Sequence, residues 1–261
     1  MSRTIAITNQ KGGVGKTTTA INLAAALAEA GRRALVVDLD PQGNASTGLG
    51  VAVAGRRLTT FDMLLDGAPL AEVAVPTGID GVSLAPATTD LASVDVQLAA
   101  DAGRAVLLRE ALRPAGDLGF DYVLLDCPPS LNLLTLNALV ASGGVLVPLQ
   151  AEFFALEGLS QLVLSVREVR ASANPGLRME GVVLTMYDRR NRLARAVEED
   201  ARATLGELVF RTVIPRNVRL SEAPSHGISV LEYDGASAGA LAYRALAGEL
   251  EARRIEQEEA A

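Results

Sequence analysis

The sequence predicts an α/β fold in which helices cover both faces of a mostly parallel central sheet. Short runs rich in Val and Leu alternate along the chain with longer helical runs, which is the pattern of right-handed βαβ crossovers. Hydrophobic residues make up 49% of the 261 residues and aromatic residues only 3%. This composition favours helices packed on an aliphatic sheet over an aromatic-cored β-sandwich. The chain shows no repeat of fixed period and no long linker, so we expect one domain over residues 1–261.

Aliphatic runs predict the strands, and longer runs between them predict the helices. The expected strands cover residues 4–8, 34–38, 81–85, 122–126, 145–149, 181–185 and 209–214. The expected helices cover residues 16–30, 89–99, 104–112, 131–141, 156–172 and 192–205. Gly31 lies where a helix C-cap is expected, and Pro175 follows another helix end. Acidic residues near the end of the chain accompany a helical tail that we expect over about residues 249–261.

A glycine-rich segment directly follows the first expected strand and leads into the first helix. Residues 9–18 read Asn-Gln-Lys-Gly-Gly-Val-Gly-Lys-Thr-Thr. The glycines let the backbone turn tightly and point successive N–H groups inward, and the helix N-terminus adds its positive end. Lys16 supplies a charge for the β- and γ-phosphates, and the Thr17 hydroxyl can ligate Mg²⁺. The segment therefore predicts a P-loop for ATP and Mg²⁺, with binding residues Gly12, Gly13, Val14, Gly15, Lys16, Thr17 and Thr18.

The segment departs from the common P-loop pattern at Gln10, where glycine is usual, and Lys11 follows it. Residues 11–17 resemble the deviant Walker A motif of the ParA/MinD family of ATPases. Residues 38–44, Asp-Leu-Asp-Pro-Gln-Gly-Asn, resemble the switch I of that family, and residues 123–129, Val-Leu-Leu-Asp-Cys-Pro-Pro, resemble its Walker B or switch II. The resemblance runs from Thr4 to about Tyr233. It implies a P-loop NTPase fold and a homodimer in which Lys11 reaches across to the nucleotide of the partner subunit.

Aspartates follow the expected strands beside this loop, at the sheet edge where ligands bind in such folds. Asp126 comes after four apolar residues and suits a carboxylate that holds a Mg²⁺-bound water; Asp38 is placed near the same ion. Asp40 lies on a loop and suits positioning of the attacking water, as the resemblance also implies. A turn or helix-capping aspartate is the alternative for each. We expect Cys127 to be a small buried packing residue. The expected catalytic residues are Lys11, Lys16 and Asp40.

No arginine near the glycine-rich segment resembles an arginine finger supplied by the same chain. Phosphoryl transfer depends on positioned positive charge. A protein that takes part of this charge from a partner subunit is slow as a monomer. The sequence therefore predicts a slow ATPase that depends on dimerisation.

Two arginine-rich segments follow neighbouring expected strands, at residues 188–195 and 211–219. Such segments can converge into one patch that suits phosphate backbones, although charge runs are often only solvated faces. Residues 214–227 and 185–188 resemble the corresponding stretches of chromosomal ParA (Soj-type) proteins. This resemblance implies DNA contacts by Arg190 and Arg219, with support from Arg189 and Arg216, and it places Pro215 beside the adenine base.

The resemblance implies a DNA-segregation ATPase for chromosomes or plasmids. Its ATP-bound dimer binds nucleoid DNA without sequence preference, and a ParB-type centromere-binding partner stimulates the hydrolysis that releases it. A ParA-like ATPase that positions another cargo is the alternative, because the adaptor partner chooses the cargo. A MinD-like membrane role is not expected, because the tail has two large apolar residues and excess acid. A metal-cluster carrier needs paired thiolates, and the chain has one cysteine.

The net charge and the sequence near the N-terminus indicate where the protein is located and what it binds. The net charge of −7 argues mildly against wholesale nucleic-acid affinity, so DNA binding requires a local basic patch. No run of about 18 apolar residues occurs, and the strand pattern starting at Thr4 leaves no room for a signal peptide. We therefore expect a cytoplasmic, nucleoid-associated protein. Because few residues precede Gln10, we expect no N-terminal helix-turn-helix domain and no operator-specific repression.

Overall fold

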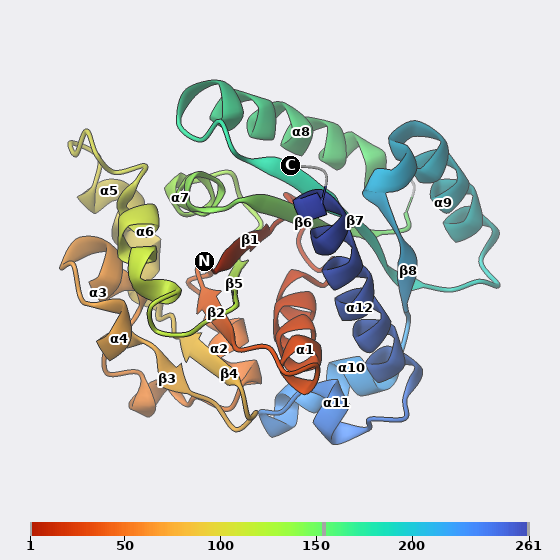
Figure 1. Ribbon diagram of the computed structural model, residues 1–261, viewed down its shortest axis with the longest axis horizontal. Helices are drawn as coiled ribbons and strands as arrows, with labels where there is room; N and C mark the ends of the chain where they lie inside the picture. Colours follow the sequence, from red (N-terminus) through yellow and green to blue (C-terminus); the bar gives the residue numbers. More distant parts are fainter. Residues whose placement is uncertain (1, 153–154, 260–261) are drawn as a thin grey trace.

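The computed structural model describes residues 2–152 and 155–259. Eight strands form one sheet in the order β3-β4-β2-β5-β1-β6-β7-β8 (Figure 1). Neighbouring strands are parallel except β3 with β4. The predicted α/β architecture is therefore confirmed. The strands are β1 (Arg3–Ile7), β2 (Ala34–Asp38), β3 (Val75–Pro76), β4 (Val82–Ala85), β5 (Tyr122–Asp126), β6 (Gly144–Gln150), β7 (Arg178–Tyr187) and β8 (Val209–Pro215).

Helices cover both faces of this sheet (Figure 1). On one face lie α1 (Lys16–Glu29), α2 (Asn44–Gly48), α10 (Val218–Glu222), α11 (Val230–Tyr233) and α12 (Ala238–Glu259). The others are α3 (Thr60–Leu65), α4 (Leu70–Val73), α5 (Val94–Gln97), α6 (Leu107–Ala111), α7 (Leu133–Ala141), α8 (Ala155–Ser172) and α9 (Arg192–Leu205). No helix in the described part of the chain combines the length and apolarity that crossing a membrane requires.

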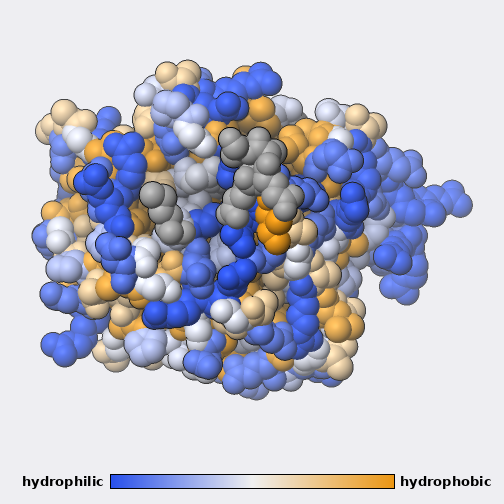
Figure 2. All heavy atoms as spheres, in the orientation of Figure 1, coloured by the Kyte–Doolittle hydropathy of each residue, from blue (hydrophilic) through white to orange (hydrophobic). Residues whose placement is uncertain are grey.

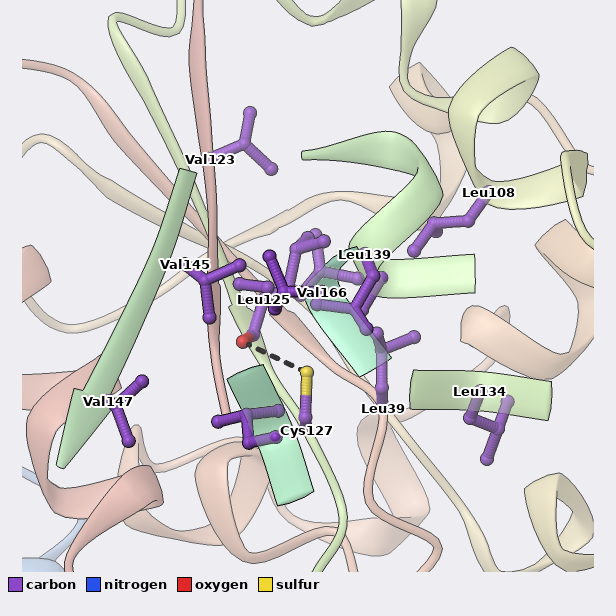
Figure 3. Packing of buried hydrophobic residues seen from close by; sticks show 14 of the residues in the cluster. Leu39, Leu108, Val123, Leu125, Cys127, Leu134, Leu139, Val145, Val147 and Val166 are labelled. Carbon is purple, nitrogen blue, oxygen red and sulfur yellow. Dashed lines mark hydrogen bonds between the residues drawn. The ribbon is translucent and has the colours of Figure 1, made fainter. Parts of the chain in front are cut away.

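The strands divide their side chains between two apolar cores because successive residues point to opposite faces. In β5, Tyr122 and Leu124 belong to the core under α1 and α12, whereas Val123 and Leu125 belong to the core under α7 and α8. The second core is drawn in Figure 3, where Cys127 lies among leucine and valine side chains. Cys127 is buried, so its expected packing role is confirmed.

Each predicted strand is present, but three stretches differ from expectation. The helix expected over 89–99 is a 3₁₀ turn (Thr89–Ser93) followed by the single turn of α5. The helix expected over 104–112 shortens to α6, because the Asp-Ala-Gly sequence at 101–103 forms a turn in which Asp101 accepts a hydrogen bond from the Gly103 N–H. The expected tail is the end of the longer α12, with residues 260 and 261 outside the described part.

The register of the central strands brings three strand ends to one level. Ile7 at the end of β1 is the neighbour of Asp126 at the end of β5, and Asp126 is in turn the neighbour of Asp38 at the end of β2. The glycine-rich loop leaves the sheet directly after β1. Residues that are far apart in sequence therefore meet at the carboxyl edge of the sheet, as parallel topology requires.

Candidate functional site

The loop between β1 and α1 has the backbone that its glycines predict. Gly13 (φ 74°) and Gly15 (φ 89°) lie in the left-handed region, where a side chain would be strained. Helix α1 begins at Lys16, so its free N–H groups face the loop. The Thr185 hydroxyl of β7 donates a buried hydrogen bond of 2.8 Å to the Val14 carbonyl. This contact ties the loop to the sheet in a preformed concave shape.

The two lysines of the loop are held by different groups. Lys16 is buried, and its Nζ donates a hydrogen bond of 3.0 Å to the backbone carbonyl of Lys11. Burial lowers the pKa of Lys16, and the nearby Asp126 carboxyl opposes that shift. The Lys11 side chain extends the other way and forms an ion pair of 2.5 Å with Glu152, just beyond β6. Lys11 is therefore paired within its own subunit in this structure.

Asp38 and Asp126 are fully buried on neighbouring strands, and their surroundings differ. The backbone N–H and the hydroxyl of Ser46 donate to Asp38 at 2.8 and 2.7 Å. Burial raises the pKa of Asp38 to about 6, against the opposing effect of Ser46. Both carboxyl oxygens of Asp126 are buried without a hydrogen-bond partner among the described residues. Burial, with the Asp38 carboxyl adding to it, raises the pKa of Asp126 well above its ordinary value, and the nearby Thr17 hydroxyl offsets this only in part.

These carboxyl groups fit a magnesium ion bound beside the loop. A buried carboxylate without a partner is costly, and a cation with its water ligands supplies both charge and hydrogen bonds. No group of three His, Cys, Asp or Glu side chains is placed to hold an ion directly in residues 2–152 and 155–259. An ion bound mainly by phosphate oxygens, water and the Thr17 hydroxyl is the type that Mg²⁺ prefers.

Asp40 lies on the loop after β2, at the rim of this buried pair. Its backbone N–H donates to Asp38 at 3.2 Å, and its own carboxyl accepts a hydrogen bond of 3.0 Å from the Gln42 N–H. The turn closes at Gly43, which lies in the left-handed region (φ 61°). The side chain is half-buried. Asp40 is therefore anchored by its loop but accessible, which suits a group that orients a water molecule.

A cavity of about 370 Å³ opens beside the glycine-rich loop. Its lining includes Gly15 and Thr18 of the loop and helix α1, together with Pro215 and Tyr243. Met186, also on its wall, has a left-handed backbone (φ 51°) that is unusual for a residue with a side chain. The structure thus places Pro215 and the loop on one hollow, as expected for a nucleotide whose base extends from its phosphates.

A second hollow, of about 470 Å³, adjoins the first at the ends of β7 and β8. Arg189, Arg190 and Arg216 line it, together with Ala238 and Ala242 of α12. Arg216 and Pro215 line both hollows. Figure 2 shows hydrophilic side chains gathered at the edge of the molecule where Figure 1 places α9. Arg190 is 92% exposed and pairs with Asp188 at 3.2 Å.

The fourth expected arginine does not line this hollow. Arg219 lies on α10 and forms ion pairs with Glu222 at 2.8 Å and with Asp234 at 3.3 Å. Sequence reasoning therefore placed three of the four arginines together and missed the acidic partners of the fourth. It also missed Glu152, Ser46 and Thr185 as contacts of the site. These contacts join distant segments, and no local pattern marks them.

Comparison with known proteins agrees with this geometry. A protein-family profile described as an AAA domain matches residues 2–179. The chromosome partitioning protein ParA of Caulobacter vibrioides is 54% identical over 257 residues, covering 98% of this chain and 96% of that protein. The chromosome-partitioning ATPase Soj of Thermus thermophilus is 57% identical over 251 residues, covering 96% of each chain. The chain belongs to the ParA/Soj family of ATPases. The resemblance inferred from the three motifs is thus confirmed.

A solved structure extends the comparison to the fold. The crystal structure of cobyrinic acid a,c-diamide synthase from Mycobacterium smegmatis, with bound ADP and magnesium, has a TM-score of 0.82 to this chain. The two are 40% identical, and the match covers 95% of this chain and 93% of that one. The predicted P-loop NTPase fold is confirmed.

Proposed function

We propose that this chain is a DNA-segregation ATPase that partitions a chromosome or plasmid. Residues 1–261 act as one ATPase domain, an interpretation that the single sheet supports. The names of the ParA and Soj relatives support the partitioning role. The observation that carries the proposal is the adjacency of the two hollows, which share Pro215 and Arg216. A nucleotide in the first hollow can therefore affect how a polyanion binds at the second hollow through these shared residues.

The first hollow and its loop bind ATP with Mg²⁺. The P-loop N–H groups and Lys16 hold the phosphates, Thr17 ligates the ion, and Asp38 and Asp126 hold its water ligands. Asp40 orients the attacking water. Magnesium supplies charge neutralisation at the phosphates when it is bound. The relative solved with ADP and magnesium supports this choice of ligands.

Lys11 completes the site of a second subunit in an ATP-dependent homodimer. Its side chain reaches away from its own loop to Glu152, and the pair is about half exposed. A lysine on such an accessible arm is free to exchange one anionic partner for another, because an exposed ion pair contributes about 0–1 kcal/mol. Hydrolysis is slow until a ParB-type partner stimulates it.

Double-stranded DNA binds at Arg189, Arg190 and Arg216 of the second hollow, and at Arg219 on the adjoining α10, without its sequence being read. Guanidinium groups suit phosphate oxygens, and such binding weakens steeply with salt. The dimer presents two such surfaces to one duplex, so nucleotide controls DNA binding by controlling assembly. The protein is then cytoplasmic and associated with the nucleoid, with no contact to the membrane.

A titration with fluorescent duplex DNA in ATP, ADP or no nucleotide, at two salt concentrations, tests the proposal. We expect binding that requires ATP, falls with salt and is indifferent to sequence. Arg190→Gln weakens it, whereas Arg113→Gln, an exposed arginine beside α6, serves as the matched control. Equal affinity in ATP and ADP would contradict the proposal.

The Mycobacterium smegmatis structure is described as a diamide synthase, so amide synthesis is a second activity to consider. An enzyme that takes ammonia from glutamine through a cysteine needs an accessible thiol of low pKa. Cys127 is the one cysteine of the chain, and burial raises its pKa. Its Sγ donates to the Leu125 carbonyl at 3.7 Å within the apolar core (Figure 3). The thiol therefore has a packing role and does not support that activity.

A further inference from the structure

We propose that Glu222 and Asp234 form a carboxylate clamp on Arg219 that competes with DNA phosphate for its guanidinium. The clamp lowers the affinity of each subunit for DNA. It thereby raises the DNA concentration at which the assembled dimer binds. This inference rests on the proposed function and on the DNA contact that the sequence resemblance implies for Arg219, which lies on α10, directly after Arg216 of the second hollow. It assigns a regulatory role to two acidic residues that lie outside the nucleotide site.

The guanidinium of Arg219 is engaged from several directions. Its Nη1 donates to Glu222 Oε2 at 2.8 Å, and its Nε lies 3.3 Å from Asp234 Oδ2. The carbon of the guanidinium lies 6.0 Å from the centre of the Tyr233 ring, and the Tyr233 hydroxyl donates to Glu222 at 3.3 Å. The hydrogen bond from Arg219 to Glu222 is also the main reason that the pKa of Arg219 is raised. One arginine is thus surrounded by two carboxylates and an aromatic ring.

Glu222 and Asp234 lie on two neighbouring elements, and hydrogen bonds fix the position of each element. Arg219 and Glu222 share α10, whose start is capped by the Asn217 side chain accepting from the Arg219 N–H at 2.9 Å. Asp234 follows α11, and the first residue of α11, Val230, donates its N–H to the Asn22 side chain of α1 at 2.8 Å. That bond is buried. The clamp therefore lies between α10, which lines the first hollow, and the end of α11, which is anchored to α1.

The same donors cannot serve a carboxylate and a phosphate at once. Carboxylates and phosphates both accept paired hydrogen bonds from one guanidinium fork. Arg219 and its two acids remain 37–45% exposed at their side chains, so DNA has access to all of them. Exposed ion pairs are weak because solvent screens their charges, so this clamp lowers the affinity for DNA but still opens when DNA binds.

Glu222→Gln tests the clamp, because glutamine keeps an oxygen for the Tyr233 hydroxyl but carries no charge. We expect affinity for fluorescent duplex DNA in Mg·ATP to rise about 2- to 5-fold for each subunit that contacts the duplex. Asp234→Asn gives a rise in the same direction and provides a second variant if the first folds poorly. Glu232→Gln is the control: Glu232 is exposed on α11 and forms no ion pair within residues 2–152 and 155–259.

The decisive measurement repeats Glu222→Gln in an Arg219→Gln background. A clamp that acts through the guanidinium has no effect once that group is absent, so the gain in affinity disappears. A gain that persists there, or a gain equal to that of Glu232→Gln, means that only net charge matters and overturns the inference. A Glu222→Gln variant that folds and binds DNA as tightly as the wild type also overturns it. If wild-type protein shows no ATP-dependent DNA binding, the proposed function itself fails, which is a distinguishable result.

Discussion

Lys16 and Lys11 are joined by a hydrogen bond of 3.0 Å from the Lys16 ammonium to the Lys11 backbone carbonyl. The Lys16 side chain therefore extends back across the glycine-rich loop, whereas the Lys11 side chain extends outward to Glu152. The two lysines of one motif therefore have different surroundings. Lys16 is buried beside the loop, whereas the Lys11 side chain lies on the outside of the loop.

Alanine substitutions separate these two roles. Lys16→Ala removes a charged donor from a buried phosphate site, so we expect ATP affinity to fall about 10- to 100-fold. Lys11→Ala leaves ATP binding within a few-fold of the wild type, but it removes ATP-dependent dimerisation and turnover. Binding of a fluorescent ATP analogue and sedimentation in Mg·ATP measure the two effects. Loss of ATP binding to a similar extent in both variants would contradict the separate roles.

Asp40 provides a test of catalysis without loss of binding. We expect Asp40→Ala to abolish phosphate release while the protein still binds Mg·ATP, because the carboxylate orients water and does not hold phosphate. Asp40→Asn preserves an acceptor for the Gln42 N–H, so it keeps the turn and removes only the charge. Phosphate release should be lost in both variants. Full turnover in either one removes the role assigned to Asp40.

The fold and the nucleotide loop were predictable because local patterns encode them. Strand runs such as residues 34–38 and 122–126 were expected with the bounds that the structure has. The glycine-rich loop lies between β1 and α1 as its sequence requires. The short edge strand β3 was missed because it has two residues, one of them Pro76, which is typical only of sheet edges.

The partners of the charged residues were not predictable from local sequence. Glu152 lies 141 positions from Lys11, and Asp234 lies 15 positions from Arg219 across a change of element. The arginine-rich segments were interpreted from their charge and from the resemblance, and neither shows that Arg190 and Arg219 are paired with acids. Such pairs depend on how separate elements pack. Only the three-dimensional arrangement reveals them.

We expect the buried carboxyl group of Asp126 to lower the stability of the nucleotide-free protein. Its carboxyl oxygens are buried and lack well-formed hydrogen bonds within the described residues, so Asp126→Asn removes the cost of burying a charge there. We expect nucleotide-free Asp126→Asn to unfold at higher urea, with a gain of about 1–3 kcal/mol. The control is Asp95→Asn, because Asp95 is exposed and its side-chain oxygen accepts from the Leu133 N–H at 3.0 Å. Magnesium and ATP should stabilise the wild type more than this variant. A loss of stability in the nucleotide-free variant would show that Asp126 is already satisfied.

Glu251 of α12 provides a pH-dependent test of how the last helix is held to the sheet. It accepts a hydrogen bond of 2.7 Å from Arg32 and another from the Tyr122 hydroxyl. Burial opposes its ionisation, but these hydrogen bonds outweigh that effect and hold the pKa of Glu251 below its ordinary 4.5. A carboxyl whose pKa is lowered in the folded state stabilises the fold above pH 4.5, and this stabilisation disappears as the pH falls through the lowered value.

We therefore expect Glu251→Gln to cost about 1–2 kcal/mol at pH 7, after a discount for partial exposure. The difference from the wild type should shrink as the pH is lowered below the ordinary pKa, because the wild-type carboxyl then becomes neutral as well. Urea unfolding across this range measures it. Glu256→Gln is the matched control, since Glu256 is exposed on the same helix and its substitution should change little at any pH. A cost that stays constant with pH would mean that Glu251 stabilises the protein through its shape and not through its charge.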